Sequence, residues 1–203
     1  MSFQWIIDNA EAISIDTQPN VSTTITRDGT ARSTSRGGDT WRFTVTLPNG
    51  PRWSDYRNNI ALAQALGRTT TANIQINDTG QTSWLNAYQG NCANVNAVTA
   101  SWTTGNTITL TGGQAASGFN FRAGDFIQLG ASGHVYQVAA NVAFNSNTVT
   151  LNRPILDAAG SATLRIGPAV TWNVLCTQFP TWSIFARDQV SWSGAFVFYE
   201  NLV

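Results

Sequence analysis

The chain has 203 residues, of which 11% are charged, and its eleven arginines and eleven acidic residues give a formal net charge of zero. Soluble domains usually carry about 25% charged residues. A protein that binds nucleic acid regardless of sequence needs a clustered cationic surface, and this chain shows no large one. So few charges protect a free monomer poorly, which favours a protein whose surfaces are covered by partners.

No secretory signal is expected, because the N-terminal residues lack a basic segment followed by an apolar one. No apolar run approaches the roughly 20 residues needed to cross a bilayer, so we expect no membrane partner. Cys92 and Cys176 lie far apart in the sequence. We expect both to be buried thiols, and a disulfide between them is the alternative.

The first elements are expected to be short strands, at residues 3–7, 12–16 and 21–26, with a connection at residues 8–10. Residues 27–30 (Arg-Asp-Gly-Thr) are expected to form a turn. The polar stretch 31–38 carries Arg32 and Arg36. It is either a mobile arm or an edge strand that continues into the next element.

The clearest pattern runs from residue 41 to residue 67. Trp41, Phe43, Val45 and Leu47 alternate with polar residues, which predicts a strand with one buried face. The prolines and the Asn-Gly pair of residues 48–51 should end it. A helix with an N-cap at Ser54 or Asp55 is expected next; its apolar face comprises Tyr56, Ile60, Ala63 and Leu66, and Gly67 caps its C-terminus.

The rest of the chain is predicted to be β structure and loops. A strand at residues 72–76 should pair back on the sheet, and residues 77–100 should form a loop. Short strands follow at 107–110, 126–129, 134–139, 148–151 and 163–166, a spacing typical of a small barrel or sandwich. Gly167-Pro168 is a plausible hinge. Strands are expected at 170–175 and 195–199, with an aromatic loop at residues 178–194 between them.

These elements predict a mainly β fold with a nested organisation. Residues 1–90 and 168–203 would form one β-sandwich-like domain with one helix, because the last 35 or so residues are too few to fold alone. Residues 98–167 would form a small β module inserted into it.

Two segments carry a resemblance to a known family. The first is RSTSRGGDTWRFTVTLP with the short helix and ALGRTTTANIQI that follow it, and the second is FNFRAGDFIQLGASGHVYQVAANVAFNSNTVTLNRPIL. Together they resemble distal tail proteins of long-tailed (siphovirus-type) bacteriophages. Neither segment is a catalytic motif, so the resemblance concerns fold and role.

The resemblance implies a structural virion protein, made in the host cytoplasm and placed at the tail tip or baseplate. In that family a belt domain forms a ring, usually a hexamer, and carries an inserted OB-like barrel module. The ring joins the tail tube protein to the hub or tip protein, and DNA passes through its lumen. We therefore expect Arg27, Arg32, Arg36 and Arg42 to pair across subunits or line the lumen, and the aromatic segment with Trp182 and Trp192 to contact a partner.

Two turns combine glycine with aspartate before an aromatic strand residue, at Gly37-Gly38-Asp39 and at Gly124-Asp125. Glycine permits a positive φ, and the aspartate can accept hydrogen bonds from backbone amides. We therefore expect the five residues of these two turns to have a structural role.

No enzyme and no cofactor is expected. His134 is the sole histidine, so a Ser-His-Asp triad would need it, and it lacks the cysteines or histidines of a zinc site. The only glutamates, Glu11 and Glu200, lie near the two ends of the chain, which is a poor basis for a glycosidase. The inserted module holds only three arginines, too few for a single-strand nucleic-acid groove.

A carbohydrate-binding β module is the main alternative function. Such modules are also poor in charge and rich in tryptophan, and Trp102, Trp182 and Trp192 in or near loops would form the stacking platform. The competing interpretation is that these rings are core or interface residues. Binding to a host glycan therefore stays an open expectation.

Overall fold

The structure is a computed structural model that describes residues 3–18, 21–25, 31–35, 39–77, 82–131, 133–185 and 188–202, with side chains for all of these except 21–25 and 31–35. It is mainly β, with 42% strand and 15% helix, as the sequence predicted. The helices are α1 (Gln4–Asp8), α2 (Trp53–Leu66) and the 3-10 turns η1 (Ser83–Asn86) and η2 (Gly167–Ala169).

The strands are β1 (Ala12–Gln18), β2 (Val21–Ile25), β3 (Ala31–Ser35), β4 (Thr40–Thr46), β5 (Thr71–Ile74), β6 (Thr99–Trp102), β7 (Thr107–Gly112), β8 (Phe119–Phe121), β9 (Phe126–Gln128), β10 (Val135–Gln137), β11 (Val142–Ala143), β12 (Thr148–Thr150), β13 (Gly160–Thr163), β14 (Arg165–Ile166), β15 (Trp172–Gln178), β16 (Thr181–Phe185), β17 (Gln189–Ser193) and β18 (Phe196–Glu200).

The main sheet joins the two ends of the chain. Its order is β1-β4-β18-β15-β5, and every neighbouring pair is antiparallel. The predicted alternation in β4 is confirmed, because Trp41, Phe43 and Val45 are buried and the residues between them are half-buried. In register with them, β18 adds Phe196 and Phe198 to the same apolar face.

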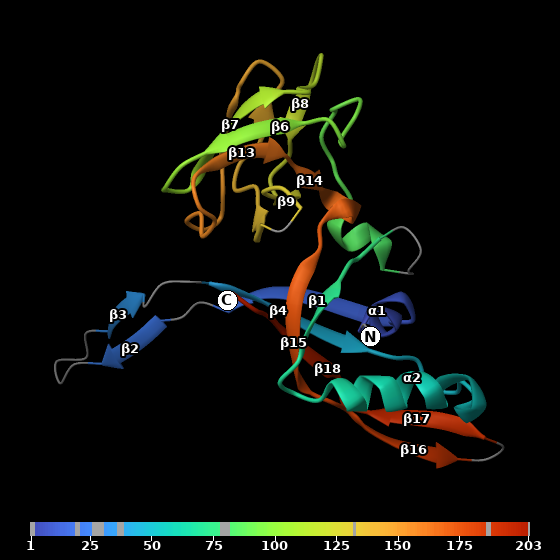
Figure 1. Cartoon of the computed structure of the whole chain (residues 1–203). Coiled ribbons are helices and arrows are strands. Elements are labelled where there is room, and N and C mark those ends of the chain that lie inside the picture. Colours follow the sequence, from blue (N-terminus) through green and yellow to red (C-terminus); the bar gives the residue numbers. More distant parts are fainter. Residues whose placement is uncertain are drawn as a thin grey trace.

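Helix α2 covers this apolar face, as expected (Figure 1). Ile60 and Ala63 are buried in the core, and Gly67 caps the helix with a φ of 64°. The predicted N-cap was wrong, because the helix begins at Trp53 and no side chain at Ser54 or Asp55 caps it. Asp188 in the β16–β17 turn supplies the acceptors instead: its carbonyl accepts from the Trp53 amide at 2.7 Å.

The predicted strand at residues 3–7 is a helix, α1. Phe3, Ile6, Ile7 and Ala10 are all buried, and their spacing of three and four residues is helical. The Gln4 side chain ties this helix to the residue after β5, since its oxygen accepts from the Gln75 amide at 2.8 Å.

The predicted aromatic loop is also wrong, because residues 181–193 form the hairpin β16–β17. Trp182 lies opposite Trp192, and Ile184 lies opposite Val190. Cross-strand pairs of aromatic and β-branched residues stabilise such a hairpin. Asp188 adopts a φ of 69° in the turn.

The polar segment after β1 contains a second hairpin, in which β2 pairs with β3. Within residues 31–38, Ala31–Ser35 forms a strand that pairs with β2 in a two-stranded sheet separate from the main sheet, and the predicted continuation into the Trp41 strand lies outside the described residues. The predicted turn at residues 27–30 lies outside the described residues.

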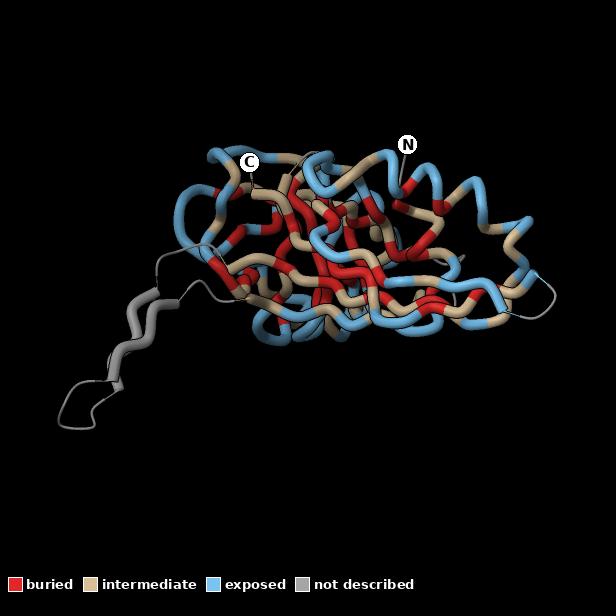
Figure 2. Tube along the Cα trace, turned by 90° about the horizontal axis from the view of Figure 1, so that it is seen from below, coloured by how far each residue is buried: buried red, intermediate tan, exposed pale blue. Residues whose placement is uncertain are grey.

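Strands β6 to β14, which we call the β module, enclose a second apolar core. They form sheets of order β12-β7-β6-β13, β10-β9-β14 and β11-β8. Figure 1 places this module on one side of the main sheet, and Figure 2 shows the buried residues gathered inside the body. The residue boundaries predicted for the two domains stay predictions.

Both cysteines are buried free thiols, as expected. Among the described residues, no helix combines the length and apolar character that crossing a bilayer requires.

Candidate functional site

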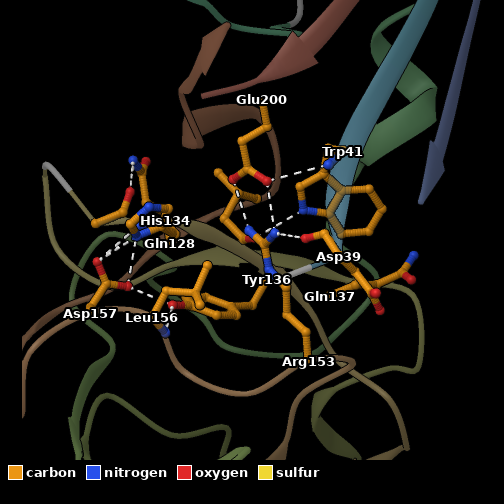
Figure 3. A network of polar contacts seen from close by, with 12 residues as sticks. Asp39, Trp41, Gln128, His134, Tyr136, Gln137, Arg153, Leu156, Asp157 and Glu200 are labelled. Carbon is orange, nitrogen blue, oxygen red and sulfur yellow. Dashed lines mark hydrogen bonds and ion pairs between the residues drawn. The ribbon is translucent and has the colours of Figure 1, made fainter. Parts of the chain in front are cut away.

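The β module meets the main sheet at a buried ion pair (Figure 3). The two terminal nitrogens of Arg153, Nη1 and Nη2, donate to the two carboxylate oxygens of Glu200 at the end of β18, each at 2.8 Å, and Arg153 itself follows β12. The two side chains are only 2% and 3% exposed. A bidentate pair of this kind fixes orientation as well as distance.

The same arginine satisfies backbone groups from two other segments. It donates to the carbonyls of Asp39, just before β4, and of Val135 in β10. The Trp41 indole also donates to the Val135 carbonyl, at 3.0 Å, and the Trp41 amide donates to Glu200 at 3.3 Å. One network therefore holds β4, β10 and β18 together.

Aromatic packing continues across the junction. The Phe126 ring of the β module lies edge-on to Trp41 and Trp172 of the main sheet, with centroids 5.3 and 5.7 Å apart. Phe126 and Val135 belong to the main sheet's core cluster although they lie in module strands. Around these rings the junction is thus packed like a protein interior.

His134, Asp157 and Tyr136 form a second polar cluster beside this junction (Figure 3). The Nδ1 atom of His134 lies 3.0 Å from one Asp157 oxygen, and the Tyr136 hydroxyl donates to the other at 2.7 Å. The Tyr136 hydroxyl in turn accepts from the Leu156 amide at 2.8 Å. These hydrogen bonds tie the loop between β12 and β13, which contains Leu156 and Asp157, to His134 and Tyr136.

The carboxylate of this cluster sets the protonation of its neighbours. The hydrogen bond with Asp157 raises the pKa of His134 against the opposing effect of burial. Burial alone would raise the pKa of Asp157, but hydrogen bonds from His134 and Tyr136 outweigh it and lower the pKa. The pair therefore favours a charged imidazolium next to a charged carboxylate.

A polar cavity of about 520 Å³ opens between the β module and the main sheet. Its charged lining residues are His134, Arg165 and Glu200. Amide and hydroxyl side chains from both sides complete the wall, namely Asn73, Gln128, Thr171, Asn173 and Asn201. The cavity can hold a small polar molecule.

Of the four predicted arginines, only Arg42 is described with its side chain. Arg42 lies in β4 on the polar face of the main sheet, opposite Asp16 of β1 and Tyr199 of β18, and its buried Nε has no hydrogen-bond partner. Arg32 lies in β3 opposite Thr24, and its side chain is not described. Arg27 and Arg36 lie outside the described residues.

Two of the three tryptophans predicted for a stacking platform are buried, and Trp182 is half-buried. Trp102 in β6 and Trp192 in β17 are 8% and 9% exposed, and all three tryptophans lie in strands rather than loops. Trp182 stacks on Trp53 of α2, with ring centroids 4.6 Å apart. These contacts are those of core residues.

In the Gly124-Asp125 turn of the β module, the glycine has a positive φ and the aspartate accepts hydrogen bonds from backbone amides, as predicted. Gly124 has a φ of 98°, which favours glycine. Asp125 accepts from the Arg122 amide at 2.7 Å and from the Gln89 amide at 2.9 Å, and it is 2% exposed. In the other turn, Asp39 contributes its carbonyl to Arg153, and Gly37 and Gly38 lie outside the described residues.

Large apolar side chains are exposed at several places in the described part of the chain, namely Leu62 in α2, Trp84 and Leu85 in η1, Phe144, Leu156, and Ile184 and Phe185 in β16. Ile184 and Phe185, at the end of β16, are 49% and 46% exposed. Trp84 in η1 is 86% exposed. Exposed aromatic residues of this size are characteristic of protein contacts.

The sequence pattern did not reveal Arg153, Asp157 and Glu200 as site residues. Arg153 and Glu200 are 47 residues apart, so no local spacing links them. The residues that the structure describes contain no cluster of three His, Cys, Asp or Glu side chains able to hold a metal ion. Comparison with protein-family models and with curated proteins finds no match for the chain.

Proposed function

We propose that this chain is a structural subunit of a bacteriophage tail tip, a distal tail protein that forms a ring. The ring would connect the tail tube to the hub or tip protein and leave a lumen through which DNA passes. The resemblance of the two sequence segments motivates the proposal. The observation that supports it most is the unprotected edge of the main sheet.

Strand β1 lies at one edge of the main sheet and β5 at the other, and neither pairs with a further strand in the described part of the chain. Monomeric proteins protect such edges with lysine, proline or a bulge. The 7 residues of β1 contain no lysine and no proline, and Asp16 is their only charge. This strand is suited to pairing with another copy of the chain.

The exposed apolar residues supply further contact surfaces. The Ile184–Phe185 end of the β16–β17 hairpin lies far along the main-sheet side of the molecule, away from the β module (Figure 1). We assign it to contact with the tube or hub protein, and the β module to the outside of the ring.

The test is the oligomeric state of variants at two matched strand edges. Ser14→Lys places a positive charge on the exposed β1 edge, and Ser161→Lys does the same on β13, which is an edge strand of the β module. Light scattering coupled to size exclusion should show that Ser14→Lys dissociates the oligomer and that Ser161→Lys leaves it intact. Loss of the oligomer in both variants, or in neither, would count against pairing through β1.

A further inference from the structure

The cavity between the β module and the main sheet is lined by an arginine, Arg165, that pairs with no carboxylate of the described residues. Arg165 of β14 lines this cavity, and within the described part of the chain its guanidinium makes a single hydrogen bond, a 3.3 Å contact with the Thr171 hydroxyl. It forms no ion pair with any residue that the structure describes. A guanidinium has five N–H donors in a fixed fork, so most of its hydrogen-bonding capacity is unused.

The other charged groups at the cavity neutralise one another. Glu200 is matched by the bidentate contact with Arg153, and Asp157 is matched by His134 when the imidazole is protonated. With His134 protonated, these two pairs are neutral, and the positive charge of Arg165 is left unbalanced. When His134 loses its proton, the negative charge of Asp157 balances the positive charge of Arg165, and the groups together are neutral.

His134 provides a second donor to the same cavity. Its Nδ1 is held by Asp157, and its Nε2 makes no hydrogen bond with the described residues. The side chain is 24% exposed and lines the cavity. A protonated imidazole held by a carboxylate presents an oriented N–H to whatever occupies the space beside it.

We propose that this cavity binds a small hydroxylated anion, a carboxylate or phosphate ester, with Arg165 pairing with the oxyanion. Arg is well suited to this role because its fork matches both groups in a bidentate geometry. His134 donates a further hydrogen bond, and Asn173 and Thr171 face the hydroxyl groups. The volume of about 520 Å³ lies within the range of small-molecule sites. This site does not depend on ring formation.

The experiment measures binding of three probes to the full chain by calorimetry or ligand-observed NMR. Glucuronate carries a carboxylate, glucose 6-phosphate carries a phosphate, and glucose is the neutral control. We expect at least one of the two anions to bind about tenfold or more tightly than glucose, because only the anions can pair with Arg165. The stronger of the two identifies the oxyanion.

The matched variants are Arg165→Gln and Arg122→Gln. Both remove one arginine from the β module, but Arg122 is exposed and lies over the Phe119 ring, away from the cavity lining. We expect Arg165→Gln to weaken anion binding about tenfold or more and Arg122→Gln to leave it unchanged. A circular-dichroism melt of each variant checks that the fold persists.

Binding should also weaken as the pH rises. The charged groups that face His134 are Asp157, Glu200 and Arg153, with Arg165 in the same cavity lining. Deprotonation of His134, as the pH rises through its raised pKa, removes one positive charge, and His134→Gln should flatten this dependence. The proposal is overturned if neither anion binds, if glucose binds equally well, or if the two arginine variants behave alike.

Discussion

The buried ion pair between Arg153 and Glu200 gives a sharp prediction about stability. Glu200→Gln removes the negative charge and places an amide NH₂ group next to the guanidinium of Arg153. The glutamine oxygen can still accept from one donor, but the second 2.8 Å contact becomes a meeting of two donors. Because Arg153 is only 2% exposed, water cannot replace the lost acceptor. Removing one partner of a buried pair costs about 3–5 kcal/mol.

The measurement is urea unfolding followed by tryptophan fluorescence. The control is Glu11→Gln, since Glu11 is exposed and its substitution should change the unfolding free energy by less than about 0.5 kcal/mol. The double variant Arg153→Met with Glu200→Gln should recover part of the loss, because no uncompensated charge stays buried.

Two results would refute this reasoning. The first is that Glu200→Gln destabilises the fold no more than Glu11→Gln does, which would mean that the charge of Arg153 is satisfied in another way. The second is that the effects of Arg153→Met and Glu200→Gln on the unfolding free energy add, whereas the effects at contacting residues should deviate from additivity by about 0.5–3 kcal/mol.

Three further predictions concern other parts of the structure. Arg42→Ala should weaken the oligomer more than the monomer fold, and Arg57→Ala on the exposed side of α2 should change neither. Light scattering measures the oligomer and thermal melts measure the fold. Equal losses of oligomer and fold in Arg42→Ala would contradict an interface role. Tyr136→Phe should lower the unfolding free energy by about 1–3 kcal/mol, because the Leu156 amide loses its acceptor and the Asp157 carboxylate loses a donor. Because the pKa of His134 is raised, its contribution to stability is present below the unfolded-state pKa and is lost as the pH rises through the folded-state pKa. Because the pKa of Asp157 is lowered, its contribution is present above the unfolded-state pKa and is lost as the pH falls through the folded-state pKa. The unfolding free energy of His134→Gln, measured by urea unfolding, should therefore depend less on pH near neutrality than that of the unchanged chain.

The elements with strong local patterns were predictable from the sequence. In β4 the alternation of Trp41 and Phe43 with polar residues fixed both the strand and its buried face. In α2 the spacing of Ile60 and Ala63 identified the buried side, and Gly67 marked the end. The mainly β fold follows from such patterns repeated along the chain.

Short or long-range features were not predictable in the same way. In the five residues of α1, the apolar run Trp-Ile-Ile fits a strand as well as a helix, and only the burial of both Phe3 and Ala10 decides. The start of α2 depends on Asp188, which lies far away in the sequence. The pairing of Arg153 with Glu200 depends on how the β module docks, and no local spacing encodes that arrangement.

The most direct test of the assembly role is electron microscopy of the purified chain in negative stain, with its mass measured by light scattering. We expect closed rings whose mass is an integer multiple of the 21.9 kDa chain, with six copies as the number that the family resemblance implies. A monodisperse monomer of 21.9 kDa at every concentration tested would contradict the proposed function.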